Sequence, residues 1–529
     1  MEPCKELIAF RMSNPYTMSE SNPAKLHNLI DGKWCSTKNY NLLPDPLNGE
    51  KFIHVPKTSE EELEEFIISM KKVPKTGLHN PFKNPQRYAQ YGAICRRAAE
   101  LLHMPDICNH FAKLIQRIMP KSEPQALGEV KIVRTFLENF SGDNLRYLAS
   151  SYQVPGDGTG QRTTGYRWPY GPVIVISPFN FPLEIPALQL MGALFMGNKP
   201  LIKPHSKTTV VMEEFIRMLI YSGMPATDVD LIHIQGPVFE KIYAKAGIRM
   251  TQFTGSSEIA EKLSLSTGGR LKIEDSGLDW KVLGPDVSNV DYVVWQCDQD
   301  SYSLSGQKCS AEKLLFVHEN WAKPELKLYE KMKERAAMRN LNDLTLSPVL
   351  SLKNKEFFEY VEKLLKLEGA KVLFGNEEIK GHKIPPDYGS FVATAIFVPL
   401  NHFLTNEGFE LLSKEVFGPF KVITEYKDSE LDQVLQVLER IPLHLTAAVV
   451  SNNPFFKHKV LGNTVNGTTY AGQRARTTGA PQNHWFGPAG DPRCCGIGTP
   501  YAIQYTWSCH RELISDEEVP KKFNAPKPS

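Results

Sequence analysis

Between about Ser59 and Ser150, apolar residues recur every three or four positions, as they do on the buried face of a helix. The spacing is clearest in Glu61–Met70 and in Tyr91–Leu102, and prolines from Pro81 to Pro85 interrupt it. The pattern therefore predicts a mostly helical N-terminal part.

From Gly171 the pattern changes to short β-branched runs that alternate with amphipathic segments such as Thr208–Tyr221. This alternation favours right-handed βαβ units on a parallel sheet. The predicted strands are Val173–Ser177, Pro200–Lys203, Leu231–Ile234, Met250–Phe253 and Leu271–Ile273. Such sheets bind ligands beyond the carboxyl ends of their strands, where Asn180, Lys203 and Gly255 fall.

A second α/β stretch runs from about Asp291 to Ser451. Its predicted strands are Tyr292–Trp295, Leu314–Val317, Thr394–Val398 and Thr446–Val450. A tract rich in Gly, Thr and Pro follows Gly462, and Tyr501–Ile514 then alternates like a strand. We therefore expect two α/β units and a C-terminal strand.

The composition excludes several classes of protein. The chain has 529 residues, of which 41% are hydrophobic and 23% charged, so a large core can form and wholesale disorder is excluded. Its 61 basic and 59 acidic residues leave too little net charge for an electrostatic nucleic-acid partner. The apolar stretch Val173–Ile202 contains charged residues and four prolines, so we expect no membrane insertion.

The nine cysteines are scattered and form no C-x-x-C pair, which fits a reducing compartment. We expect no metal site, because no His, Cys, Asp or Glu cluster has the spacing of metal ligands. The adjacent Cys494 and Cys495 are better explained as packed thiols than as a redox pair. The first thirty residues mix acidic and basic side chains and predict neither a secretory signal nor a transit peptide.

Cys309 is the strongest candidate for chemistry, because it lies among small residues in Ser305–Ala311 and follows Lys308. A nearby cation favours the thiolate, which is the nucleophilic form of cysteine. A cysteine between small residues is also a common core filler. This segment alone leaves both interpretations open.

Further motifs resemble those of the aldehyde dehydrogenase superfamily, in the same order, over roughly Gly171–Trp507. Lys203 follows Asn180 by 23 positions, and Glu274 precedes Cys309 by 35, as in that family. The segments that carry the resemblance are Ser177–Pro182, Phe253–Ser256, Glu415–Pro419 and the Cys309 segment itself. Phe253–Ser256 is similar to the family's pyrophosphate turn, where backbone N–H groups and a helix N-terminus meet phosphate.

The resemblance implies an α/β aldehyde dehydrogenase fold with a Rossmann-like NAD-binding domain, an α/β catalytic domain and a small β oligomerisation element. The resemblance implies an NAD-binding domain at 1–281, a catalytic domain at 282–499, and a C-terminal oligomerisation strand and tail at 500–529. The first domain includes a helical N-terminal part and an oligomerisation hairpin at 151–168. Family members pair through an exposed strand, with Tyr501–Ser508 and the hairpin near Ser151–Trp168 as candidates. A homodimer or a dimer of dimers is therefore expected.

The resemblance also implies roles for residues. Cys309 would be the nucleophile, Glu274 the general base and Asn180 an oxyanion donor. The implied cofactor-binding residues are Ser177, Pro178, Phe179, Lys203, Gly255, Ser256, Glu415 and Phe417. By residue type alone, Asn180 could be a turn residue and Glu274 a surface carboxylate.

Two departures from the family pattern bear on these roles. Asp275, Ser276 and Gly277 follow Glu274, where an apolar residue and two glycines are usual, so Asp275 is an alternative base. Ser206 stands where a carboxylate often holds the adenosine ribose. The expectation of NAD over NADP therefore rests on the resemblance, because a carboxylate repels a 2′-phosphate and a serine does not.

A closer resemblance is to the glutamate-γ-semialdehyde (Δ1-pyrroline-5-carboxylate) dehydrogenases. It rests on Ser177–Phe181, Gly306–Ala311 and Thr477–Ala480 with Phe486, and the segment Ala471–Gly490 is similar to the plant and protist branch, aldehyde dehydrogenase family twelve. The resemblance implies that Ser310, Gly479 and Ala480 grip an α-carboxylate, and that Phe181 and Phe486 enclose the aliphatic part. A core aromatic pair is the alternative for the two phenylalanines.

The implied function is NAD-dependent oxidation of L-glutamate γ-semialdehyde to L-glutamate through a cysteine thiohemiacetal and thioester. This reaction is the last step of proline catabolism and takes place in the mitochondrial matrix in the family. Two alternatives stay open: a dehydrogenase of another small anionic aldehyde, and a non-catalytic binding protein that keeps the fold.

Overall fold

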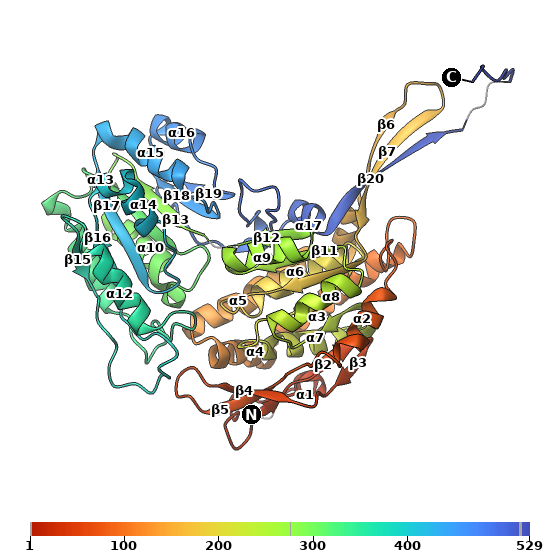
Figure 1. The fold of residues 1–529 in the computed structure, drawn as a ribbon, viewed down its shortest axis with the longest axis horizontal. Helices are drawn as coiled ribbons and strands as arrows, with labels where there is room; N and C mark the ends of the chain where they lie inside the picture. Colours follow the sequence, from red (N-terminus) through yellow and green to blue (C-terminus); the bar gives the residue numbers. More distant parts are fainter. Residues whose placement is uncertain (1–2, 276, 518–520, 529) are drawn as a thin grey trace.

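A computed structural model of the chain describes residues 3–275, 277–517 and 521–528. Two seven-stranded sheets form the centres of two halves, and a three-stranded arm extends from one of them (Figure 1). The α/β fold class predicted from the sequence is confirmed.

The first sheet has the strand order β12-β11-β8-β9-β10-β2-β3. Its strands are β2 (Asn28–Ile30), β3 (Lys33–Cys35), β8 (Pro172–Ile176), β9 (Lys199–Lys203), β10 (Asp230–Leu231), β11 (Met250–Thr254) and β12 (Leu271–Glu274). The five strands from β12 to β10 are parallel, which confirms the predicted βαβ arrangement. The antiparallel strands β2 and β3, which we did not predict, add an edge from the N-terminal segment.

Helices cover both faces of this sheet, and strand β8 shows why. Val173 and Val175 pack on one face and Ile174 and Ile176 on the other, so the strand is buried throughout. One face is covered by α3 (Gln86–His103), α4 (Pro105–Ile118), α5 (Glu123–Asn139), α6 (Glu184–Phe195) and α7 (Val210–Tyr221), the other by α2 (Leu63–Lys71), α8 (Gly236–Lys245) and α9 (Ser257–Ser266). The predicted helical N-terminal part is thus confirmed.

The second sheet has the order β15-β16-β17-β14-β13-β18-β19, and it is parallel except for β15. Its strands are β13 (Asp279–Leu283), β14 (Glu312–His318), β15 (Lys371–Phe374), β16 (Thr394–Phe397), β17 (Phe420–Tyr426), β18 (Thr446–Val450) and β19 (Thr468–Ala471). Its helices are α10 (Val290–Tyr302), α11 (Leu328–Ala337), α12 (Asn354–Leu364), α13 (Leu400–Leu404), α14 (Asn406–Leu412), α15 (Leu431–Arg440) and α16 (Pro454–Gly462). Strand β13 spans the position of the predicted domain boundary, between 281 and 282.

The predicted strand Tyr292–Trp295 is wrong, because this segment lies inside helix α10. The side chain of Asn289 accepts a hydrogen bond from the backbone N–H of Tyr292 (3.0 Å) and caps the helix. Val293, Val294 and Cys297 are buried on one side, while Trp295 is exposed. A short apolar run can belong to either element, and here the cap and the helical burial pattern decide.

The C-terminal segment also differs from the prediction. The first part of Tyr501–Ile514, including the pairing candidate Tyr501–Ser508, forms helix α17 (Pro500–Trp507), and the strand β20 is Ser508–Asp516. Pro500 occupies the first turn of α17, and the hydroxyl of Thr499 accepts a hydrogen bond from the backbone N–H of Ala502 (3.2 Å).

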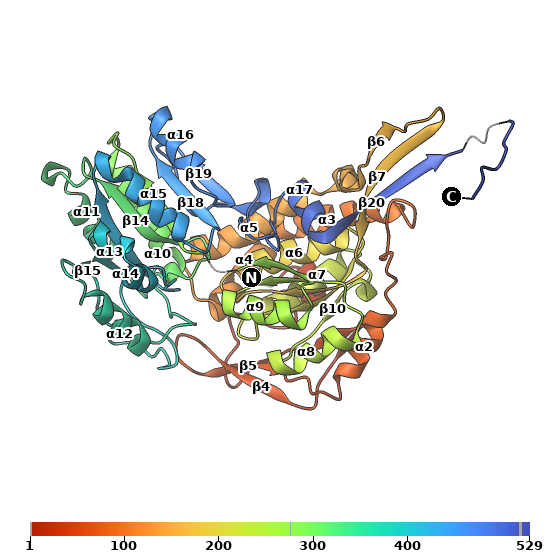
Figure 2. The same ribbon diagram turned by 45° about the horizontal axis from the view of Figure 1, so that its top comes forward.

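Strand β20 pairs along its whole length with β7 (Gln161–Pro169), which also pairs with β6 (Tyr152–Pro155). The hairpin predicted near Ser151–Trp168 is therefore present. These three strands form the arm, which extends away from the body in both views (Figures 1 and 2).

The remaining elements complete the N-terminal part and the connections. They are α1 (Lys5–Phe10), the sheet of β1 (Ala24–Lys25), β4 (Tyr40–Pro44) and β5 (Lys51–Pro56), and short turns of which η1 (Gly142–Ala149) and η3 (Ser303–Gly306) are the longest. Among the described residues, no helix combines the length and the apolar character needed to cross a membrane.

Candidate active site

Cys309 lies in the wall of two cavities. The larger has a volume of about 710 Å³ and the smaller about 390 Å³. The thiol therefore borders two separate spaces, as a nucleophile between two reactants would.

The larger cavity opens at the carboxyl ends of β8, β9 and β11, as expected for a parallel sheet. Asn180 follows β8, Lys203 ends β9, and Gly255 lies between β11 and helix α9. The cavity is lined by every residue predicted for the cofactor, namely Ser177, Pro178, Phe179, Lys203, Gly255, Ser256, Glu415 and Phe417. Asn180 and Glu274 line it as well, so the three predicted catalytic residues share this cavity.

The smaller cavity collects the residues predicted for the substrate. Its lining includes Phe181, Ser310, Gly479, Ala480 and Phe486. Residues that we did not predict complete it: Ile132, Glu184, Ile185, Arg476, Thr478, Pro481 and Ile497. The chain brings these together from α5, α6, the Cys309 segment and the tract after β19.

The turn that carries Cys309 is strained. Leu304, Ser305 and Gly306 have consecutive positive φ values of 57°, 50° and 63°. A Cβ on Gly306 would lie 2.0 Å from the carbonyl oxygen of Gly418, so only glycine fits there. The ammonium group of Lys313 donates to the carbonyl oxygens of both Gly306 and Gly418 (2.9 Å each) and so joins this turn to the Glu415–Phe417 segment.

The loop that carries Asn180 is held by a buried ion pair. Lys121 donates to the backbone carbonyl of Asn180 (3.0 Å) and to the carboxylate of Glu129 (2.7 Å). Glu129 in turn accepts hydrogen bonds from the backbone N–H groups of Leu183 (2.8 Å) and Glu184 (3.1 Å). Lys121, just before helix α5, and Glu129, within it, thus hold the loop at Asn180 and at the start of α6.

Glu274 lies beside the thiol of Cys309, and each group affects the protonation of the other. Burial raises the pKa of Glu274 to about 7, although the thiol and the hydroxyl of Thr254 lower it in part. Burial and the carboxyl group of Glu274 raise the pKa of Cys309 well above its usual value. The carboxyl of Asp275 instead contacts Ser257, and burial raises its pKa.

Lys308, the cation that the sequence places beside Cys309, interacts with the thiol through its charge but makes its hydrogen bonds elsewhere. Its ammonium group donates to the backbone carbonyl of Gln299 (3.0 Å) and to the hydroxyls of Ser303 (2.7 Å) and Thr478 (3.1 Å). The thiol is instead surrounded by carboxyl groups, which raise its pKa. Proximity in sequence did not determine the direction of the lysine side chain.

The polar end of the smaller cavity is organised around Thr478. The hydroxyl of Ser310 donates to that of Thr478, and the Thr478 hydroxyl contacts the backbone carbonyl of Ser310, each at 3.3 Å. A Cβ on Gly479 would lie 1.8 Å from the hydroxyl oxygen of Tyr470, which is bonded to His484 (2.8 Å). A larger residue at 479 would displace this backbone from the cavity wall.

Comparison with protein families identifies the architecture. The model of the aldehyde dehydrogenase family matches residues 35–489 of the chain. The chain belongs to this family.

Two plant members are similar over nearly the whole length. One is Delta-1-pyrroline-5-carboxylate dehydrogenase 12A1, mitochondrial, of Arabidopsis thaliana, with 55% identity over 98% of this chain and 93% of the relative. The other is a probable aldehyde dehydrogenase of Linum usitatissimum, with 55% identity over 96% of this chain and 92% of the relative.

Solved structures of more distant proteins share the fold. Aldehyde dehydrogenase 21 of Physcomitrella patens, in complex with the reaction product succinate, has a TM-score of 0.77 at 17% identity, over 93% of this chain and 98% of that chain. NADP-dependent glyceraldehyde-3-phosphate dehydrogenase of Bacillus halodurans has a TM-score of 0.78 at 20% identity, over 93% and 99%. This aldehyde dehydrogenase therefore has the fold expected from its sequence.

Sequence reasoning missed several residues around the family site. The most important are Lys121 and Glu129 behind Asn180, and Glu184, Arg476 and Thr478 in the smaller cavity. Glu184 offered a signal, since it is a carboxylate inside an otherwise apolar segment. Lys121 offered none, because its partner carbonyl at Asn180 lies 59 positions away in the sequence.

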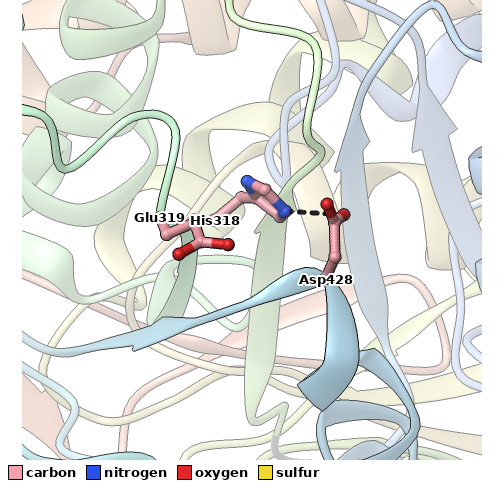
Figure 3. A group of neighbouring side chains, drawn as sticks. All are labelled: His318, Glu319 and Asp428. Carbon is pink, nitrogen blue, oxygen red and sulfur yellow. Dashed lines mark hydrogen bonds and ion pairs between the residues drawn. The ribbon is translucent and has the colours of Figure 1, made fainter.

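Among the residues that the structure describes, one group of potential metal ligands comes together, namely His318, Glu319 and Asp428 (Figure 3). The histidine ring already uses both nitrogens, because Nε2 is bonded to Asp428 (3.0 Å) and Nδ1 accepts from the backbone N–H of Asn320 (3.2 Å). Both acids are exposed, and the cluster lies outside the lining of the two cavities. Hydrogen bonds within the protein thus already occupy the histidine of this group.

Proposed function

We propose that this aldehyde dehydrogenase oxidises L-glutamate γ-semialdehyde, which is in equilibrium with Δ1-pyrroline-5-carboxylate, to L-glutamate with NAD. The observation that carries the proposal is that Cys309 borders both cavities, with the cofactor residues around one and the substrate residues around the other. The name of the Arabidopsis relative supports the same substrate.

The larger cavity fits a dinucleotide. Its volume of about 710 Å³ is within the usual range for cofactor sites. Gly255 and Ser256 precede helix α9, whose N-terminal N–H groups suit a pyrophosphate, and Lys203 offers a cation in the same wall. Bound NAD would accept the hydride that the reaction removes from the substrate carbon. Glu415 and Phe417 would hold its nicotinamide ribose.

In the proposed mechanism, Glu274 takes the thiol proton as the sulfur of Cys309 adds to the aldehyde carbon. A pKa near 7 suits a base at neutral pH. The side-chain amide of Asn180 and the backbone N–H of Cys309 would stabilise the oxyanion. After oxidation to the thioester, Glu274 gives up the thiol proton to solvent and, as the carboxylate, takes a proton from a water that adds to the thioester carbon. The carbon–sulfur bond of this adduct then breaks, the acid leaves, and the sulfur regains a proton from Glu274.

The choice of Glu274 over Asp275 as the base rests on contact with the nucleophile. The thiol of Cys309 is among the groups that shift the pKa of Glu274, whereas Ser257, Asp491 and Arg493 act on Asp275. A base must reach the proton that it removes, so Glu274 is the better candidate.

The smaller cavity suits an aldehyde that carries a carboxylate. Ser310 with the backbone N–H groups of Gly479 and Ala480 would bind the α-carboxylate by charge-assisted hydrogen bonds. Phe181 and Phe486, which line the same cavity, would enclose the methylene groups between the two ends.

We propose NAD rather than NADP. Glu356 lines both the larger cavity and a neighbouring cavity of about 370 Å³, so a carboxylate lies where these two cavities adjoin. The nearby cations are engaged, Lys207 with the carbonyl of Leu350 (2.8 Å) and Lys353 with Asp387 (2.9 Å). A 2′-phosphate would therefore meet repulsion from Glu356, which the cation of Lys203 in the wall of the larger cavity would have to offset. Comparing kcat/KM for the two cofactors tests this, and equal values would contradict it.

The test of the activity is NADH formation from L-glutamate γ-semialdehyde, compared with other small anionic aldehydes such as succinic semialdehyde. We expect the five-carbon amino-acid aldehyde to have the highest kcat/KM, and Cys309→Ala to abolish turnover while NAD still binds. A higher kcat/KM for another aldehyde would show that this other aldehyde is the preferred substrate. If the thiol of Cys309 is no more reactive than the other cysteine thiols and no aldehyde is turned over, the alternative of a non-catalytic binding protein is favoured.

We also propose a homodimer or a dimer of dimers formed through the arm. Its edge strands expose Tyr152, Val154 and Ile514, which are apolar side chains that a partner subunit could cover. The mitochondrial matrix is the proposed location, because the Arabidopsis relative is named mitochondrial and its reaction belongs to proline catabolism.

A further inference from the structure

Glu184 is a carboxylate in the wall of the smaller cavity, and the proposed mechanism does not use it. It begins helix α6, its exposure is 6%, and it lines the same cavity as Ser310, Gly479 and Ala480. Within the described part of the chain its carboxylate makes no hydrogen bond. Its oxygens, unlike those of Glu274, are not fully shielded from solvent, which agrees with a position facing the cavity.

The neighbouring charges leave Glu184 without a cation of its own. Lys121 is the cation close to it, and Lys121 is already paired with one oxygen of Glu129 (2.7 Å). The other oxygen of Glu129 accepts two backbone N–H groups, so this acid is fully satisfied. Of the two carboxylates, Glu184 is therefore the one that can accept a further donor.

The surroundings of Glu184 disfavour its charged form unless a cation lies close to it. Burial, and then the carboxylates of Glu129 and Glu274, raise the pKa of Glu184 well above its usual value, and Lys121 only partly opposes this. A positive group in the cavity would interact strongly with this carboxylate, because little water separates them.

We propose that Glu184 binds the α-ammonium group of the amino-acid aldehyde, so that the cavity selects the zwitterion over an aldehyde that carries a carboxylate alone. This inference rests on the proposed function. Ser310, Gly479 and Ala480 would hold the α-carboxylate, and the ammonium group is attached to the same carbon. The carboxylate of the substrate thus meets hydrogen-bond donors, and its ammonium group meets an acceptor, in the same cavity.

The test compares two aldehydes of the same length, L-glutamate γ-semialdehyde and 5-oxopentanoate, which has the carboxylate but no amino group. In Glu184→Gln the ratio of kcat/KM for the first over the second should fall by roughly 10- to 150-fold, the usual range for a lost charged hydrogen bond. Ser310→Ala should lower both values together, because both aldehydes carry the carboxylate.

Glu213→Gln is the matched control for neutralising a buried glutamate. Glu213 lies on α7, is fully buried, and accepts hydrogen bonds from Arg217 (2.8 Å) and the backbone of His27 (2.8 Å), outside the lining of both cavities. Its variant should keep the wild-type ratio between the two aldehydes.

The outcomes separate this inference from the proposed function. If the unmodified enzyme does not oxidise L-glutamate γ-semialdehyde, the proposed function and this inference both fail. If it does, but Glu184→Gln leaves the ratio unchanged, only the ammonium site is wrong. If Glu184→Gln does not fold, inhibition of the unmodified enzyme decides, since L-glutamate should bind at least 10-fold more tightly than glutarate, and equal binding would overturn the inference.

Discussion

At the scale of single residues, Glu274 and Cys309 affect each other's protonation in opposite directions. Burial raises the pKa of both groups, the Glu274 carboxyl raises the pKa of Cys309 further, and the thiol partly lowers the pKa of Glu274. The thiol therefore keeps its proton at neutral pH. Transfer of the thiol proton to Glu274 therefore accompanies attack on the aldehyde rather than preceding it.

The pH dependence of turnover should report this carboxyl group. Glu274 is the proposed base and has a pKa of about 7, so kcat should rise as the pH increases from 6 to 8. Glu274→Gln should lower kcat by about 100- to 10,000-fold and remove this rise. Steady-state rates across the pH range measure both effects, with Asp275→Asn as the control. A normal profile in Glu274→Gln with loss of the rise in Asp275→Asn would reverse the assignment.

The hydroxyl of Ser310 should matter only for substrates with a carboxylate. A hydrogen bond to a charged group contributes about 1.5 to 3 kcal/mol, so Ser310→Ala should lower kcat/KM for L-glutamate γ-semialdehyde by roughly 10- to 150-fold. Pentanal, which has the same chain length and no carboxylate, should lose far less. Equal losses for the two aldehydes would show that Ser310 supports Cys309 instead.

At the scale of elements, the loops that carry Asn180 and Cys309 are held by lysines. Lys121, just before α5, holds the loop between β8 and α6, and Lys313 in β14 joins the Cys309 turn to the segment before β17. The loops themselves are short and contain strained or proline-rich backbone. Their positions are therefore set by these buried contacts rather than by local propensity.

Loss of the Lys121 pair should destabilise the protein and loosen the Asn180 loop. Both partners are only 1% exposed, so Lys121→Met leaves the carboxylate of Glu129 buried without its cation. The expected loss is about 3 to 5 kcal/mol in the free energy of unfolding, measured with urea. The double variant Lys121→Met/Glu129→Leu should recover part of it, because no unpaired charge remains. Single and double variants of equal stability would contradict the role of the pair.

At the scale of the whole molecule, the site depends on both halves. The first sheet supplies Asn180, Lys203 and Glu274 at its strand ends, and the second half supplies Cys309 and Glu415. The arm of β6, β7 and β20 extends away from the body (Figures 1 and 2), and the linings of the two cavities include none of its described residues. The cavities and the proposed subunit interface thus occupy different parts of the fold.

Removal of β20 should therefore change assembly before it changes chemistry. A chain that ends at Ser508 loses the strand that pairs with β7 and should sediment as a single subunit, whereas removal of the tail after Asp516 should leave the assembly intact. Analytical ultracentrifugation measures both. An unchanged mass without β20 would exclude the arm as the interface.

The sequence alone determined the sheets that carry the site. Continuous apolar runs such as Val173–Ile176 predicted buried parallel strands, because both faces of such strands are covered by helices. Parallel strands end at one edge, so motif residues far apart in sequence were expected to converge there, and the cavity lining shows that they do. Where an apolar run was short, as in Tyr292–Trp295, periodicity could not separate strand from helix.

Only the tertiary structure decided which partners surround the reacting groups. Lys121 meets the carbonyl of Asn180 across 59 positions, and Ser310 meets Thr478 across 168. Lys308 adjoins Cys309 in sequence, yet its ammonium group donates hydrogen bonds to neutral oxygens, and burial and nearby carboxyl groups raise the pKa of the thiol. Desolvation and charge act through space, so the pKa values of Cys309, Glu274 and Glu184 depend on neighbours that the local pattern does not contain.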